Sequence, residues 1–396
     1  MRVRVERHSV ICGSIQDSKG TTWGQNLHVT LSVTQTVNDQ SGLAINTKIL
    51  AGIAQKLLSD FDHHTWEFPC PWGLEQYGIS LGLAKQLLDN WTDNLSSQCS
   101  DNAVTNVSLT PSSALKLATD YTTTRLSFRV PFVALEKFDF SLLGNRIALD
   151  SEMPNNYRTF SPLRYPFENL TSGGAAIVIH TKQDIPNAIN SPIATHRCDE
   201  VLSKLSTVVS DQIGAAKSAS EVYQILRDFY SKPQLPIGGN VTIEEIEVSS
   251  DKGVSFLQNA GGESMLEFRL GFNATHELRL QSSTQDANNL TYGPCSTFPR
   301  HGHRWGIRIR IHLMSHGQGV AIHIEKARQS ILALWRDLHG THLNNLTRSI
   351  SNAPATSEIV LMYAKHRLEL ADLQAVEIEL IETPKNTFLW KSDFDY

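Results

Sequence analysis

A strand, a Gly-x-Ala-Ile segment, two helices and a closing strand recur along this 396-residue chain, and that repeat restricts the fold more than any other feature. The first pass contains LHVTLSV (Leu27–Val33), GLAIN (Gly42–Asn46), SLGLAKQLL (Ser80–Leu88) and a strand ending in VSLTPSSALKL (Val107–Leu117). Apolar residues three or four apart predict an amphipathic helix after GLAIN. Its apolar face is expected to contain Ile49, Ile53, Leu57 and Leu58.

The same order returns in the last third of the chain. IRIRIHL (Ile307–Leu313) is followed by GVAIH (Gly319–His323), ATSEIVLMY (Ala355–Tyr363) and VEIELIETPKNTFLW (Val376–Trp390). Helical spacing again predicts one apolar face between the second and third of these segments. That face is expected to contain Ile331, Leu334, Trp335 and Leu338.

A weaker second pass lies between these two. It consists of AAIVIH (Ala175–His180), SASEVYQIL (Ser218–Leu226) and VTIEEIEVSSDKGVSFL (Val241–Leu257). We therefore predict an α+β protein with three units, at residues 1–120, 121–258 and 259–396, in which the second unit is degenerate. Residues 150–162 read as an insertion and 253–262 as a linker. The alternative is that an unrelated α+β chain repeats this loosely.

Composition restricts the partners and the compartment. A hydrophobic content of 40% and a charged content of 19% are typical of a globular protein, and the net charge of −5 gives no basic field for nucleic acid. No apolar run approaches the length of a membrane span, and the N-terminus does not resemble a signal peptide. Five scattered cysteines without a C-x-x-C pair favour a reducing cytoplasm.

Three histidines lie on inward-facing rows of two expected strands. His301 and His303 share their parity with Trp305 and the isoleucines that follow, and His276 shares its parity with Leu266, Phe268, Leu270, Phe272 and Ala274. Buried polar groups need partners. These imidazoles therefore require a functional explanation, unless they are three unrelated polar histidines.

Several segments of the last third together resemble the 6-pyruvoyltetrahydropterin synthase family. They are FNATHEL (272–278), NLTYGPC followed by HGH (289–303), GVAIH, ATSE and the terminal IET. A close relative is the 6-carboxytetrahydropterin synthase of queuosine biosynthesis, but the Cys-x5-His-Gly-His spacing is more similar to the former enzyme, which serves tetrahydrobiopterin biosynthesis.

The resemblance implies a T-fold for each unit, an antiparallel four-stranded sheet with two helices on one face. Three units would close a pseudo-trimeric barrel of twelve strands, so this chain would be a covalent trimer. Two such chains could then stack as a homodimer.

The resemblance also implies a zinc site and a pterin site in the third unit. His276, His301 and His303 would bind Zn²⁺ and leave a fourth position for substrate. Glu382 would hold the guanidine-like edge of the pterin, and Thr356 and Ser357 would contact the pterin as well. Alternatively, Thr356 and Ser357 cap a helix beside Glu358, and Glu382 is an ordinary carboxylate at a strand end.

The remaining catalytic groups of the family are a cysteine and an Asp-His pair. Cys295 would be the thiolate that abstracts a proton, unless it is merely a buried thiol. Asp-His is replaced by His339-Gly340 in the third unit but is present in the first as Asp62-His63, where the alternative is a solvated helix end. His8 would remain at the first zinc-ligand position of the first unit. We therefore predict one composite site between units three and one.

The implied reaction acts on 7,8-dihydroneopterin triphosphate. It eliminates triphosphate with hydrogen shifts along the side chain and requires zinc but no external redox cofactor. Two alternatives stay open: an enzyme of the same fold that makes 6-carboxytetrahydropterin, and an inactive pterin-binding or scaffold protein.

Overall fold

The structure is a computed structural model of the chain. It describes residues 1–16, 22–67, 81–99, 102–112, 115–119, 124–134, 174–183, 241–250, 254–259, 261–296, 301–313 and 318–395.

The strands form one large, almost entirely antiparallel sheet. In chain order they are β1 (Arg2–Gln16), β2 (Thr22–Thr36), β3 (His64–Glu67), β4 (Val104–Ser112), β5 (Leu115–Thr119), β6 (Thr124–Ala134), β7 (Gly174–Gln183), β8 (Val241–Ser250), β9 (Val254–Asn259), β10 (Ser264–His276), β11 (His301–His312), β12 (Ala375–Thr383) and β13 (Asn386–Lys391).

The helices connect and cover these strands. They are α1 (Thr47–Leu58), α2 (Leu81–Ser96), α6 (Gln285–Tyr292), α7 (Gln318–Leu338), α8 (Leu343–Thr347) and α9 (Ser357–Leu370), with short 3-10 turns η3 (Gly293–Ser296) and η4 (Ser392–Asp395). None of the helices in the described part of the chain is long and apolar enough to cross a membrane.

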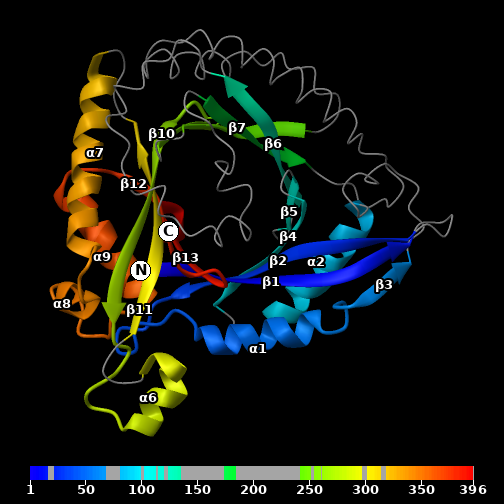
Figure 1. The fold of residues 1–396 in the computed structure, drawn as a ribbon, viewed down its shortest axis with the longest axis horizontal. Coiled ribbons are helices and arrows are strands. Elements are labelled where there is room, and N and C mark those ends of the chain that lie inside the picture. Colours follow the sequence, from blue (N-terminus) through cyan, green and yellow to red (C-terminus); the bar gives the residue numbers. More distant parts are fainter. Residues whose placement is uncertain are drawn as a thin grey trace.

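The order of strands in the sheet brings the two ends of the chain together. It runs β13-β12-β11-β10-β9-β8-β7-β6-β5-β4-β2-β1-β3, and β13 pairs in addition with β1. In that pairing Arg4 to Arg7 lie opposite Leu389 to Asn386. β3 joins β1 in parallel at Gly13–Gln16, so the sheet has 13 strands within the described residues rather than the expected twelve. Figure 1 shows the strands curving around a central space, with the helices outside.

The helix-covered face of the sheet carries the hydrophobic core. Alternation places Val3, Val5, Ile307 and Ile309 on this face, where all four are fully buried. Trp305 is equally buried and stacks on Phe272 of β10, with ring centroids 6.0 Å apart. The period-2 pattern therefore predicted this face of the third unit correctly.

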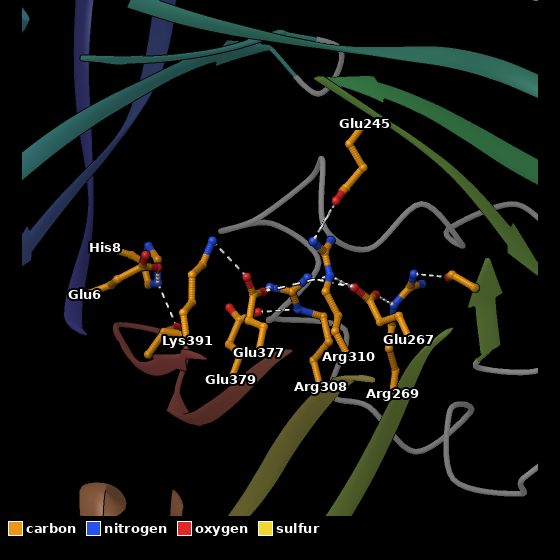
Figure 2. A network of polar contacts seen from close by, with 12 residues as sticks. Glu6, His8, Glu245, Glu267, Arg269, Arg308, Arg310, Glu377, Glu379 and Lys391 are labelled. Atoms are coloured by element: carbon orange, nitrogen blue, oxygen red, sulfur yellow. Dashed lines mark hydrogen bonds and ion pairs between the residues drawn. The ribbon is translucent and has the colours of Figure 1, made fainter. Parts of the chain in front are cut away.

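The opposite face carries a network of buried ion pairs (Figure 2). Arg308 donates to Glu267 at 2.7 Å and to Glu379 at 2.5 Å, and it also pairs with Glu377. Arg269 and Arg310 donate to the two oxygens of Glu267 at 2.7 and 2.6 Å. These cations hold the pKa of Glu267 far below its usual range despite complete burial. Both faces of this region are therefore buried, one by apolar packing and the other by paired charges.

Several predicted elements need correction. The apolar face of α1 consists of Leu50, Ile53, Ala54 and Leu58, whereas Ile49 is exposed, because the helix begins at Thr47 and turns Ile49 outward. The predicted single closing strands are pairs: β4 with β5, and β12 with β13. A turn at Pro384 and Lys385 separates the latter pair.

The three-unit organisation stays a prediction. Strands that follow one another in the described part of the chain are mostly neighbours in the sheet, as three T-fold units would require. The helix expected at 218–226 and the insertion at 150–162 lie outside the described residues. The boundaries at 120 and 258 are not tested by the strand order.

Candidate functional site

The three predicted histidines meet at one end of β10 and β11. In the antiparallel register His276 lies opposite His301, and His303 lies opposite Ala274, so all three project from the helix-covered face. The Nε2 atoms of His276 and His301 are 3.0 Å apart, and one potential ligand atom from each of the three lies within 4.8 Å of the others. Sequence parity therefore predicted this cluster.

Hydrogen bonding and burial prepare these imidazoles for a metal. Nδ1 of His276 donates to the carbonyl oxygen of Ala355 at 2.8 Å, which makes Nε2 the acceptor nitrogen of this ring, facing Nε2 of His301 at 3.0 Å. Burial lowers the pKa of His276 to about 3 and that of His303 to about 4, so both rings are neutral at pH 7. Nδ1 of His301 and Nε2 of His303 are buried without a hydrogen-bond partner among the described residues. A cluster of three imidazoles, two of which have a buried nitrogen without a partner among the described residues, fits a zinc ion.

A cavity of about 290 Å³ lies between the N-terminal strand and helix and the last third of the chain. The C-terminal part contributes Cys295, Thr356, Ser357, Glu358 and Glu382 to its wall, and the N-terminal part contributes Arg7, Leu43, Asn46, Thr47, Lys48 and Ala51. The predicted thiol and all three predicted pterin-contacting residues therefore share one cavity. The composite site between the third and first units stays a prediction.

Two buried carboxylates line this cavity. Burial raises the pKa of Glu358 to about 7 and that of Glu382 to about 7. Oε1 of Glu358 accepts a hydrogen bond from the backbone N–H of Ala44 at 2.9 Å, but its Oε2 has no hydrogen-bond partner among the described residues. Oε1 of Glu382 lies 3.8 Å from Nε2 of His276, so Glu382 connects the cavity with the histidine cluster.

Thr356 and Ser357 have different roles. Thr356 is the N-cap of α9: its Oγ1 accepts from the N–H of Ile359 and donates to the carbonyl oxygen of Gly42 at 2.6 Å. Both hydrogen-bonding capacities of this hydroxyl are thus used by the protein, which supports the capping alternative. The Ser357 hydroxyl is buried without a hydrogen-bond partner among the described residues, and it opposes the burial that raises the pKa of Glu382.

Cys295 lies in the turn η3, and residues of both chain ends position that turn. Tyr292 donates its hydroxyl to the carbonyl oxygen of Ser41 at 2.9 Å, and the Asn46 amide donates to the carbonyl oxygen of Thr291 at 2.8 Å. Burial, together with the charge of Glu382, raises the pKa of the Cys295 thiol to about 11. A cation on the nearby histidines would oppose this shift.

Asp62 and His63 form the predicted pair but do not line the cavity of Cys295. Nδ1 of His63 lies 3.1 Å from Oδ2 of Asp62, and the His63 side chain is 79% exposed. Asp62 accepts a hydrogen bond from the N–H of Cys12 at 2.8 Å, which is the main reason its pKa is lowered. Asp62 lines a neighbouring hollow of about 760 Å³, which shares Arg7, Lys48 and Ala51 with the cavity.

His8 does not occupy a zinc-ligand position. Its ring nitrogens lie 3.0 Å from Oγ1 of Thr30 and 2.8 Å from Oγ1 of Thr387, on the face opposite to the core. The prediction was wrong because His8 lies opposite Thr30 in the pairing of β1 with β2, on the face that does not carry the histidine cluster. His8 is therefore a satisfied buried histidine.

Sequence reasoning missed Glu358, Arg7 and Lys48 as cavity residues. Glu358 follows Thr356-Ser357 in the first turn of a helix, where an acidic residue is common for helix stability alone. Arg7 and Lys48 belong to β1 and α1 near the start of the chain, and only the pairing of β1 with β13 brings them to this cavity. The alternation of β1 was the one signal that placed Arg7 on the core face.

Comparison with known proteins agrees with this geometry. Residues 265–392 match the family model described as 6-pyruvoyl tetrahydropterin synthase, so this C-terminal segment is similar to that family. A solved structure of 6-pyruvoyl tetrahydropterin synthase from Caenorhabditis elegans is similar at 21% identity with a TM-score of 0.29, and the match covers 32% of this chain and 94% of that one. This likeness is too weak to carry an activity to the chain. No curated protein matches.

Proposed function

We propose that the chain is a zinc-dependent pterin synthase acting on 7,8-dihydroneopterin triphosphate, with one composite active site at the junction of its two ends. The observation that carries this proposal is the cavity that holds Cys295 and two buried carboxylates beside the histidine cluster. The family match of residues 265–392 supports a pterin synthase-type reaction.

The carboxylates account for substrate binding. A pterin presents neighbouring N–H groups along its guanidine-like edge, and Glu358 and Glu382 offer buried acceptors in one cavity. Glu358 has one buried oxygen without a partner among the described residues, as expected for an acceptor that a ligand satisfies. This pairing would orient the pterin with its side chain toward Cys295.

The reaction requires removal of a proton from a side-chain carbon. Cys295 is placed to take that proton as a thiolate, and the elimination breaks the carbon–oxygen bond to triphosphate, which leaves with the electron pair. Zn²⁺ on His276, His301 and His303 would supply Lewis acidity and favour the ionised thiol. Asp62 and His63 are proposed as the second proton relay, in the adjoining hollow.

The proposal includes the wider architecture. Three T-fold units, at 1–120, 121–258 and 259–396, would form a pseudo-trimeric barrel in which the first and third units are neighbours. The pairing of β1 with β13 supports that neighbour relation. Stacking of two chains as a homodimer is proposed only from the family resemblance.

The exposed position of His63 favours one alternative, a pterin-binding protein without catalysis. An enzyme that makes 6-carboxytetrahydropterin is the other. The test is turnover of 7,8-dihydroneopterin triphosphate by zinc-loaded protein, with product analysis, beside Cys295→Ala and His63→Ala. We expect a pyruvoyl-pterin from the wild type and at least about 100-fold slower turnover for each variant. Full activity of His63→Ala would remove the relay, and a protein that binds pterin without turnover would support the alternative.

A further inference from the structure

Two cations of the N-terminal part stand where the cavity and the neighbouring hollow meet. Arg7 and Lys48 line both spaces, the cavity of about 290 Å³ and the hollow of about 760 Å³. Arg7 comes from the core face of β1, and Lys48 from the first turn of α1. The two spaces therefore share a basic border.

The charges of this border are not neutralised by ion pairs within the described part of the chain. Arg7 donates from Nη1 to the amide oxygen of Asn386 at 2.9 Å, which orients the guanidinium without cancelling its charge. Lys48 is exposed, and no acidic side chain of the described residues forms an ion pair with it. Asp62 is the one acidic residue that lines the hollow, and its carboxylate already binds the Cys12 N–H and His63.

The cavity itself shows an independent need for a ligand. Glu358 is 1% exposed and lines the cavity, yet its Oε2 has no hydrogen-bond partner among the described residues. A buried acceptor of this kind requires a donor. A ligand with N–H groups at one end and an anionic chain at the other would satisfy Glu358 and the basic border together.

We propose that Arg7 and Lys48 bind the phosphate chain of the substrate and stabilise it as it leaves. This inference rests on the proposed function, because that function supplies a pterin with a triphosphate. Arginine contacts phosphate oxygens through two parallel N–H groups, and lysine acts as a compact charge. When the carbon–oxygen bond breaks, the electron pair stays on the triphosphate, and the two cations stabilise that added negative charge.

The test measures binding of inorganic tripolyphosphate to the full-length protein by calorimetry at low salt, so that turnover is not needed. Lys48→Met should weaken binding about tenfold, and Arg7→Gln at least as much. Lys56→Met is the matched control, because Lys56 is an exposed lysine of the same helix that lines neither space. Its affinity should equal that of the wild type.

Two results would overturn the proposal: unchanged binding by Lys48→Met, or an equal loss in Lys56→Met, which would indicate only a diffuse charge effect. Binding of 7,8-dihydroneopterin, which lacks phosphate, separates this proposal from the proposed function. If tripolyphosphate binding depends on Lys48 but dihydroneopterin does not bind, the anion site stands and the pterin function fails. If dihydroneopterin binds and Lys48→Met leaves tripolyphosphate binding unchanged, the anion site alone fails.

Discussion

The two faces of the sheet near β10–β12 bury carboxylates in opposite ways. On the inner face Glu267 receives hydrogen bonds from three arginines, and its pKa lies far below the ordinary value (Figure 2). On the outer face Glu358 and Glu382 line a cavity, and burial raises the pKa of each to about 7. The carboxylates on both faces are buried, so burial alone does not explain why their pKa values shift in opposite directions.

Pairing separates them. A carboxylate that is paired with arginines inside the protein contributes to the fold, whereas Glu358, which keeps a buried oxygen without a hydrogen-bond partner among the described residues, is held at a cost that a ligand can offset. The inner face is therefore structural, and the outer face is the candidate site. Four substitutions test this distinction, in order of expected effect.

The largest effect is expected at the centre of the ion-pair network. Glu267→Ala would leave three buried guanidinium groups without their shared partner and should lower the free energy of unfolding by about 3–5 kcal/mol. Urea denaturation measures this. Glu263→Gln, an exposed carboxylate just before β10, is the control and should change stability by less than about 0.5 kcal/mol. A similar small effect for both would mean that the network is not structural.

Glu358→Gln should change how stability depends on pH. The folded-state pKa of about 7 lies above the ordinary value of 4.5, so wild-type stability from this group is present below pH 4.5 and is lost as the pH rises toward 7. Glu358→Gln has no carboxyl group to ionise at this position, so it does not lose this stability as the pH rises. It should therefore be more stable than the wild type at pH 8 by up to about 3 kcal/mol. Thermal unfolding of the metal-free protein at pH 4.5 and pH 8 measures the difference in stability between the variant and the wild type. An equal difference at the two pH values would contradict the assigned burial of Glu358.

Loss of one histidine should remove the metal. His303→Ala should weaken zinc affinity by at least about 100-fold, since loss of a supporting partner alone costs up to that much. Competition with a chromophoric chelator measures the affinity. His312→Ala, on the same strand but outside the histidine group, should bind zinc as the wild type does. Equal zinc affinity of His303→Ala and His312→Ala would mean that the metal binds at another site.

The smallest effect concerns the junction that forms the cavity. Gly42 has a φ of +72°, and an added Cβ would lie 3.0 Å from Cγ1 of Ile359. Gly42→Ala should therefore destabilise the protein by about 1–3 kcal/mol. Gly52→Ala, inside α1 with open space around it, should stabilise the protein by about 0.5–1 kcal/mol. The two variants should thus move the melting temperature in opposite directions.

The sequence predicted the parts of this site that depend on local pattern. Strand parity brought His276, His301 and His303 to one face, and the pairing of β1 with β13 agrees with the contact between the two chain ends that the repeat would require. It failed where the answer depends on tertiary register. His8 was misplaced because the pairing of β1 with β2 was unknown, and Ile49 was misplaced because the start of α1 shifts its apolar face.

The ion-pair network and the role of Glu358 in the cavity were beyond sequence pattern for a related reason. Arg308 and Arg310 alternate with isoleucines, and such a pattern is equally typical of a solvated face. Only the curvature of the sheet turns that face inward. Likewise, Glu358 reads as a helix-terminal acid until the Gly42 loop packs against it.

The most direct measurement is the affinity of the zinc-loaded protein for 7,8-dihydroneopterin, compared between Glu358→Gln and Glu245→Gln. Glu245 is a carboxylate of the inner network, 3.2 Å from Arg310, and lies outside the cavity. We predict at least about tenfold weaker binding for Glu358→Gln, because a charge-assisted hydrogen bond is lost, and unchanged binding for Glu245→Gln. Equal affinity of the two variants would contradict the assignment of the Glu358 carboxylate to a ligand.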